Sequence, residues 1–241
     1  MVLLALALAP GIAIIFYIIG KDKYNKEPFI HLFISFLLGI FSTVPAVIIQ
    51  AILKKTLDSN FAYQSIAYYA IFAFLVVGLS EEGSKYLMLR LYAYRKKAFD
   101  EPLDGIIYGV MVSMGFATLE NVLYVFQHGY GTAIARMFLS VPAHACFGVI
   151  MGYYVGLAKF NPMRATLYKR TGLLLAVLFH GAFDFFLFLQ QSEHMLQYVS
   201  STLLGFGAFA SFFLALRLSR RSIRLHQELS RIEYERTKNL Y

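Results

Sequence analysis

This sequence has one cysteine, no tryptophan and few charged side chains. Cys146 is the single cysteine of the 241 residues, which excludes an internal disulfide framework. Its place in an apolar stretch predicts a small buried packing residue rather than a nucleophile. Charged residues make up 15% of the chain and hydrophobic residues 59%, whereas a soluble domain is about 45–50% apolar. These shares exclude a soluble globular domain and predict an integral membrane protein.

Apolar stretches long enough to cross a bilayer recur along the chain. A span needs about 20 residues for a hydrocarbon core of about 30 Å. Stretches of this kind lie near residues 2–20, 29–53, 62–89, 104–127, 133–158, 171–190 and 195–216. No internal repeat and no Gly/Ser/Pro-rich linker is present. We therefore predict an all-α polytopic bundle of about seven transmembrane helices. Six is the alternative, because the overlong third stretch can begin as an interfacial segment.

Acidic residues are scarce, and the excess of basic residues lies in alternate loops. The net charge is +8, and 18 of the 22 Lys and Arg lie at 21–27, 90–103, 159–170 or beyond residue 216. This is the positive-inside pattern, so it encodes orientation rather than nucleic-acid binding. It predicts a multi-pass membrane protein with its N-terminus outside and its C-terminus in the cytoplasm.

The two ends of the chain carry separate predictions. The first apolar stretch lacks a basic n-region and is followed by Lys21, so we predict a retained helix rather than a cleaved signal peptide. After it comes one membrane domain, residues 1–216, and then a basic tail, residues 217–241. In the tail, Leu225, Leu229 and Ile232 recur at helical spacing among charged residues, which predicts a cytoplasmic amphipathic helix.

Ionisable side chains interrupt four of the apolar stretches. They are Glu81, Glu82, Lys85, Glu120, His144, His180 and Asp184. A lone charge at mid-membrane costs roughly 2.5–3.5 kcal/mol. Such groups either neutralise one another or line a hydrated cavity. We therefore expect these side chains to converge on one polar cavity.

The spacing of these residues suggests pairs. Glu81 can reach Lys85 at i,i+4, which leaves Glu82 to hold a water as general base; the reverse assignment is nearly as good. His180 and Asp184 are also i,i+4, a spacing at which the carboxylate fixes the imidazole tautomer.

Two further spans add polar groups that have structural as well as catalytic interpretations. His144 shares its helix with glycines at four-residue spacing, which favours close approach of a neighbouring helix. Glu120 and Asn121 supply a carboxylate and an amide donor, or else an interhelical hydrogen bond.

Together these groups suit hydrolysis of a peptide bond by an activated water inside the membrane. The sequence has no His-Glu-x-x-His, no Gly-rich phosphate loop and no Ser/His/Asp or Cys/His arrangement to compete. A proton- or ion-coupled transporter is the rival class, but no repeated halves are visible. A membrane scaffold without catalysis is a third alternative.

Short motifs in this order resemble the PrsW family of intramembrane proteases, and more distantly the CAAX-processing and bacteriocin-processing membrane proteases. The motifs are Tyr24-Asn25-Lys26-Glu27-Pro28, Glu81-Glu82-x-x-Lys85, Asp104-Gly105-x-x-Tyr108-Gly109, Gly115-Phe116-Ala117-x-x-Glu120-Asn121, Pro142-x-His144 and His180-Gly181-x-x-Asp184. The match runs from about residue 8 to residue 190.

The resemblance implies a bacterial cell-membrane protease that makes the site-1 cut in a membrane-anchored anti-sigma factor, which releases a sigma factor for the stress response. By motif position Glu81, Glu82 and His180 would be the catalytic group. The supporting residues would be Glu120, His144 and Asp184, with Lys85 and Asn121 beside them.

Metal use is left open by the resemblance. A zinc site would take His144, His180 and a glutamate, with Glu82 the first choice. The ammonium of Lys85 would repel a divalent cation while stabilising an ionised carboxylate, so we expect a site without metal.

Overall fold

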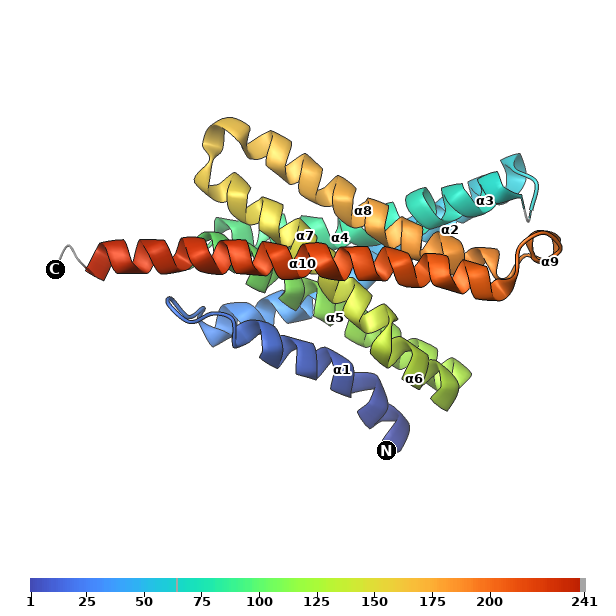
Figure 1. Ribbon diagram of the computed structural model, residues 1–241, viewed down its shortest axis with the longest axis horizontal. Coiled ribbons are helices and arrows are strands. Elements are labelled where there is room, and N and C mark those ends of the chain that lie inside the picture. The colour runs from blue at the N-terminus through green and yellow to red at the C-terminus, as the bar shows by residue number, and fades with distance from the viewer. Residues whose placement is uncertain (64, 239–241) are drawn as a thin grey trace.

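The computed structural model describes residues 1–63 and 65–238, and this part of the chain is helical with no strand. Seven of its helical segments are long and apolar enough to cross a membrane, by length and composition. They are Val2–Ile19, Phe29–Asn60, Ile66–Arg95, Pro102–His128, Tyr130–Phe160, Pro162–Leu189 and Ser201–Arg236. The expected count of seven is confirmed on this measure, and the third stretch is one of the seven; Figure 1 shows how these helices are arranged.

The first two spans are single helices, and the third is made of three consecutive helical segments. Helix α1 covers Val2–Ile19 and α2 covers Phe29–Asn60. The third span joins α3 (Ile66–Ile71), a π-helical segment η1 (Phe72–Gly78) and α4 (Leu79–Leu91). The short turn η2 (Ala93–Arg95) follows it.

The remaining four spans are formed by α5, by α6 with α7, by η3 with α8, and by α10, and the short helix α9 lies between the last two. Their bounds are α5 Pro102–His128, α6 Tyr130–Phe138, α7 Ser140–Phe160, η3 Pro162–Arg164, α8 Ala165–Leu189, α9 Glu193–Leu196 and α10 Ser201–Lys238. Helices α6 and α7 form the fifth span and meet at a break at Leu139.

The central helix is α5, and its two ends are specified locally. Glu101 and Asp104 form a reciprocal capping box, and Pro102 occupies the first turn, where no donor is lost. At the other end Gly129 has φ of 78°, a left-handed conformation that glycine adopts without strain.

Helices α5 and α7 approach closely because glycines face each other. A Cβ on Gly105 would overlap the carbonyl oxygen of Gly152, and one on Gly109 would lie 2.6 Å from that of Gly148. The glycine spacing on α7 thus permits backbone contact, as expected from the sequence. This contact places the two helices that carry Glu120 and His144 side by side.

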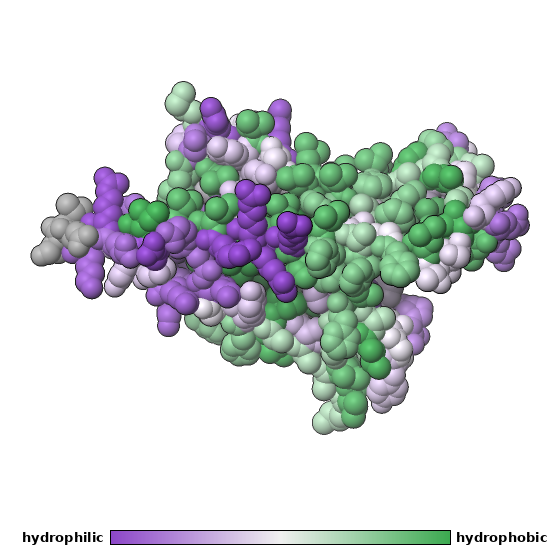
Figure 2. All heavy atoms as spheres, in the orientation of Figure 1, coloured by the Kyte–Doolittle hydropathy of each residue, from purple (hydrophilic) through white to green (hydrophobic). Residues whose placement is uncertain are grey.

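The two ends of the bundle differ in charge. We call the end formed by residues 20–28, 92–101, 161–164 and the C-terminal half of α10 the basic end. The other, formed by residues 61–63, 129 and 190–200, is the α9 end. Figure 2 shows hydrophilic side chains concentrated along the C-terminal half of α10 and a largely hydrophobic surface over the middle of the bundle.

Helix α10 continues without a break from its apolar half to Lys238. Leu225, Leu229 and Ile232 are each about half exposed on it, and the Tyr234 ring lies 5.4 Å from that of Tyr24. Residues 239–241 of the proposed tail lie outside the described residues. A cytoplasmic amphipathic role for this segment stays a prediction.

Candidate active site

Glu82 is the more deeply buried of the two adjacent glutamates and binds two partners. Its side chain is inaccessible to solvent, and its Oε1 accepts a hydrogen bond from Lys85 Nζ at 2.7 Å. The same oxygen lies 2.8 Å from His180 Nδ1 on α8. Lys85 therefore pairs chiefly with Glu82.

Glu81 has a different environment. Its Oε1 accepts a hydrogen bond from Gln50 Nε2 at 3.2 Å, while its Oε2 has no hydrogen-bond partner among the described residues. That oxygen lies 3.5 Å from Lys85 Nζ and 3.9 Å from His180 Nε2. The expected contact of Glu81 with Lys85 is present at 3.5 Å, but Glu82 is the closer partner of Lys85 at 2.7 Å, so Glu82 does not stay free. The rotation of α4 turns Glu82 toward α8 and Glu81 toward the cavity, which favours the reverse assignment; the catalytic roles of the two glutamates stay predictions.

The π-helical segment η1 accounts for this rotation. A π-helical turn widens the helix and shifts the angular position of every residue that follows. Ser80 Oγ donates to the Val76 carbonyl at 2.6 Å, within the widened turn. A Cβ on Gly78 would lie 3.4 Å from Gly181 N, so the backbones of η1 and α8 are close there. This proximity brings the glutamate pair to His180.

His180 and Asp184 form the pair expected from their spacing. His180 Nε2 lies 3.2 Å from Asp184 Oδ2, one turn along α8. Both ring nitrogens of His180 therefore face carboxylates, Glu82 on one side and Asp184 on the other. The imidazole ring is held in place and stacks on Phe147 with centroids 5.0 Å apart.

His144 connects the glutamate–lysine cluster to Glu120. Its Nδ1 lies 3.1 Å from Lys85 Nζ, and its Nε2 lies 2.9 Å from Glu120 Oε2. Because the Lys85 ammonium is a donor, His144 Nδ1 accepts and Nε2 carries the proton given to Glu120. The His144 and His180 rings lie 5.1 Å apart between centroids, so the four spans do converge.

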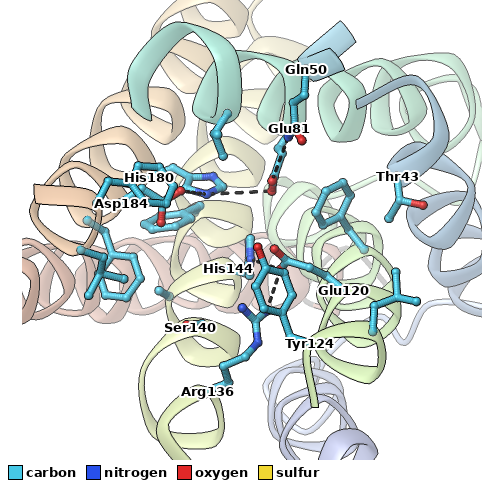
Figure 3. Close-up of a pocket in the computed structure, with 18 of the residues that line it drawn as sticks. Thr43, Gln50, Glu81, Glu120, Tyr124, Arg136, Ser140, His144, His180 and Asp184 are labelled. Carbon is cyan, nitrogen blue, oxygen red and sulfur yellow. Dashed lines mark hydrogen bonds and ion pairs between the residues drawn. The ribbon is translucent and has the colours of Figure 1, made fainter. Parts of the chain in front are cut away.

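These side chains border one cavity of about 460 Å³. Figure 3 shows Glu81 and Gln50 on one side of it, His180 and Asp184 on a second, and His144, Glu120 and Arg136 on a third. Glu82 lies behind this wall rather than in it. The cavity thus has water-accessible carboxylate and imidazole groups, surrounded by apolar residues of α2, α5 and α8.

Asn121 has a structural role. Its amide donates to the Ala7 carbonyl at 2.8 Å and accepts from Arg136 Nε at 2.9 Å. It joins α1, α5 and α6 and does not line the cavity.

Arg136, which was not among the expected site residues, belongs to this cluster. Its Nη2 donates to Glu120 Oε2 at 2.8 Å, and its guanidinium lies 4.4 Å from the centroid of Tyr124. The sequence contains one indication that Arg136 is unusual, because it is among the four basic residues outside the basic loops and tail. Gln50 and Tyr124 gave no comparable signal.

The donor set also has the composition of a metal site. Glu81, Glu82, His144 and His180 are buried, and each offers one ligand atom within 4.8 Å of the others. Glu81 Oε2 and Glu82 Oε2 are buried without a hydrogen-bond partner among the described residues. Two imidazoles and a carboxylate are the ligands of many catalytic zinc sites. The residues present therefore fit zinc.

Comparison with known proteins agrees with the geometry. A family model described as "PrsW family intramembrane metalloprotease" matches residues 27–216. "Protease PrsW" of Geobacillus kaustophilus is 40% identical over 77% of this chain and 79% of its own length. "Protease PrsW" of Bacillus subtilis is 40% identical over 77% of this chain and 82% of its own length.

"Protease PrsW" of Clostridioides difficile is 39% identical over 78% of this chain and 80% of its own length. No solved structure matches. The matched residues include every motif that lines the cavity. The chain therefore belongs to the PrsW family of intramembrane proteases.

Proposed function

We propose that this protease makes the site-1 cut in a membrane-anchored anti-sigma factor and so releases a stress-response sigma factor. Family membership supports the substrate class. The observation that carries the chemistry is the buried cluster of Glu81, Glu82, His144 and His180 beside a cavity of about 460 Å³. A cavity of this size accommodates an extended peptide segment and a water.

In the proposed reaction, Glu81 is the general base. Its Oε2, which has no hydrogen-bond partner among the described residues, accepts a proton from the water as the water oxygen attacks the peptide carbonyl carbon. The carbonyl π bond breaks, and the resulting oxyanion faces the imidazoles of His144 and His180. Glu81 then returns the proton to the leaving amine as the C–N bond breaks. Water is thereby divided between the new carboxyl and amine termini.

Glu82 is a positioning residue in this scheme. It holds Lys85 and His180 from behind the cavity wall, at 2.7 and 2.8 Å. Asp184 fixes His180 from the other side, and Glu120 fixes His144. These contacts lock the imidazoles in one orientation before substrate binds.

We include zinc in the proposed site, in place of the metal-free expectation. Lys85 does lie against the glutamate pair, as the metal-free argument requires. Its charge, however, is already neutralised by Glu82 at 2.7 Å, so the repulsion of a cation is reduced. Glu82, His144 and His180 would hold the ion, which leaves Glu81 as the base and a fourth position open for water. When bound, zinc would polarise the substrate carbonyl and activate water.

We place substrate access at the α9 end. Four cavity-lining residues lie toward that end: Gln50 in the second half of α2, Tyr124 near the end of α5, Arg136 in the first part of the fifth span and Gln191 just after α8. With the positive-inside orientation, that end is outside the cytoplasm. Glu81 and Glu82 lie in the last part of the third apolar stretch, 62–89, next to the basic loop at 90–103. The cavity extends the other way, which suits a substrate cut on its outer side.

We assign the protease activity to residues 1–216 and treat residues 217–241 as a cytoplasmic tail. The family match ends at residue 216, which supports this boundary.

The proposed activity is tested by co-expression with a tagged anti-sigma substrate. Glu81→Gln, Glu82→Gln and His180→Ala should each leave the substrate uncut while the protein accumulates in the membrane. Glu193→Gln, on an exposed residue of α9, should cut normally. Undiminished cleavage by both active-site glutamate variants would favour the transporter or scaffold alternatives.

A further inference from the structure

A second cavity lies on the other side of α7 from the active site. It has a volume of about 270 Å³ and is bordered by α1, α5, α7 and α10. Helices α1 and α10 both pack against α5 and α7. The cavity is the slot left between α1 and α10, with α5 and α7 as its floor. We call it the α1–α10 slot.

The interior of the slot is apolar. Ile14 and Ile18 of α1, Val149 of α7 and Ile223 of α10 line it. Ser219, a polar lining residue, is already bonded, because its hydroxyl donates to the Cys146 carbonyl at 3.1 Å. The slot therefore offers a surface for a hydrocarbon chain rather than for a polar peptide or a hydrated ion.

Positive charge gathers at one end of the slot. Arg220 lines it, is exposed, and has no ion-pair partner among the described residues. Lys21 Nζ lies 4.7 Å over the ring of Tyr17, which also lines the slot. Gln227 Nε2 donates to the Lys21 carbonyl at 2.9 Å and joins α10 to the end of α1 there. Among the described residues that line the slot, none is acidic.

We propose that the α1–α10 slot binds one anionic phospholipid. An acyl chain lies against Ile14, Ile18 and Val149, and the phosphate lies at Arg220 with Lys21 nearby. An apolar slot that ends in unpaired cations is complementary to a lipid that carries both an acyl chain and a net negative head group. A zwitterionic lipid has the same chains but no net charge, so it gains less at Arg220.

The slot is coupled to the active site through α7. Cys146 lines the slot two positions beyond His144, which is about 200° around the helix. A bound lipid therefore covers the face of α7 opposite His144 and fills a void that would otherwise allow the helix to shift. We expect protease activity in vesicles to rise with anionic lipid content, as a consequence of binding.

The experiment measures binding directly. Purified full-length protein, in wild-type form and as the inactive Glu81→Gln variant, is exchanged into detergent micelles that contain phosphatidylglycerol or phosphatidylcholine. Retained lipid is counted by native mass spectrometry. We expect phosphatidylglycerol to be retained in preference to phosphatidylcholine by both proteins. Because the inactive variant is included, failure of the proteolytic proposal does not affect this measurement.

Two variants test the location. Arg220→Gln should reduce phosphatidylglycerol retention about fivefold, since a basic residue near an anionic lipid contributes about 1 kcal/mol. Arg236→Gln, further along the same helix, is the matched control and should retain lipid normally. Ile14→Trp should fill the slot and reduce retention of both lipids. Equal retention of the two lipids by wild type, or of phosphatidylglycerol by Arg220→Gln and Arg236→Gln, would overturn the proposal.

Discussion

Glu120 Oε2 lies 2.9 Å from His144 Nε2 and 2.8 Å from Arg136 Nη2, so one carboxylate oxygen joins the imidazole to a guanidinium from another helix. Arg136 lies on α6, the short helix before the break at Leu139. The orientation of His144 thus depends on a residue outside the motifs.

Removing Arg136 should therefore impair catalysis without removing any group that touches the substrate carbonyl. We expect Arg136→Gln to lower kcat about 10–100-fold, the usual effect of losing a partner that orients an active-site ligand. Arg136→Lys should recover part of the activity, because it restores the charge but not the paired hydrogen bonds. Cleavage by purified protein measures both. The exposed Arg164→Gln is the control and should leave kcat unchanged.

Glu81 and Glu82 should differ in stability although both are required for activity. Glu82→Gln leaves the Lys85 ammonium without its main partner in a buried site, which costs about 3–5 kcal/mol. Glu81→Gln keeps that pair and the contact with Gln50, so its thermal midpoint should stay near wild type. Thermal unfolding in detergent measures the difference. Lys85→Met added to Glu82→Gln should restore stability but not cleavage. Equal midpoints for the two single variants would contradict the assignment of Lys85 to Glu82.

Metal content gives a test that does not depend on cleavage. Purified protein should contain about one zinc per chain, and chelation should remove both zinc and activity until micromolar zinc is added back. His144→Ala should lower the zinc content, whereas the exposed His128→Ala should not. Full activity in chelated protein without zinc would restore the metal-free mechanism.

The glycine contact between α5 and α7 should be intolerant of side chains. Gly109→Leu would force a side chain into the Gly148 carbonyl, and the helices would have to separate. We expect a loss of at least about 1–3 kcal/mol of stability, together with loss of cleavage as Glu120 and His144 move apart. Gly131→Ala, at a position with open space around its Cβ, is the control and should unfold at the wild-type temperature.

The basic end should show a pH dependence of its own. Glu27 follows α1 and accepts a hydrogen bond from Tyr108, and burial raises its pKa to about 7, with Asp22 and Asp100 adding repulsion. The folded protein then holds this proton more tightly than the unfolded chain does. The free energy of unfolding should therefore fall as pH rises from about 4.5 to about 7.

Glu27→Gln should flatten that part of the profile, since glutamine keeps an acceptor for Tyr108 but does not titrate. Thermal midpoints of the wild type and of Glu27→Gln, measured between about pH 5 and about pH 8, test this difference. Glu193→Gln is the surface control. A wild-type midpoint that rises across the interval, or a Glu27→Gln profile parallel to wild type, would show that this carboxyl does not carry a raised pKa.

The sequence alone determined the spans and the chemical groups. Bilayer thickness requires about 20 apolar residues per helix, so length and composition were enough to locate seven spans. An isolated charge in lipid costs free energy, so the sequence already predicted that Glu120, His144 and His180 lie close together. The pair of His180 with Asp184 followed from helical spacing, because i,i+4 contacts are local.

Only the tertiary structure decided how those groups divide their roles. The π-helical segment precedes α4, whose rotation turns Glu82 toward His180 and leaves Glu81 facing the cavity, and such a rotation depends on packing against α8. Arg136 joins the site because α6 folds back beside α5, a contact between different helices. The direction in which the cavity extends depends on how the helices cross. Local patterns specify each helix and its polar residues, whereas relative rotation and depth arise from contacts between segments distant in the chain.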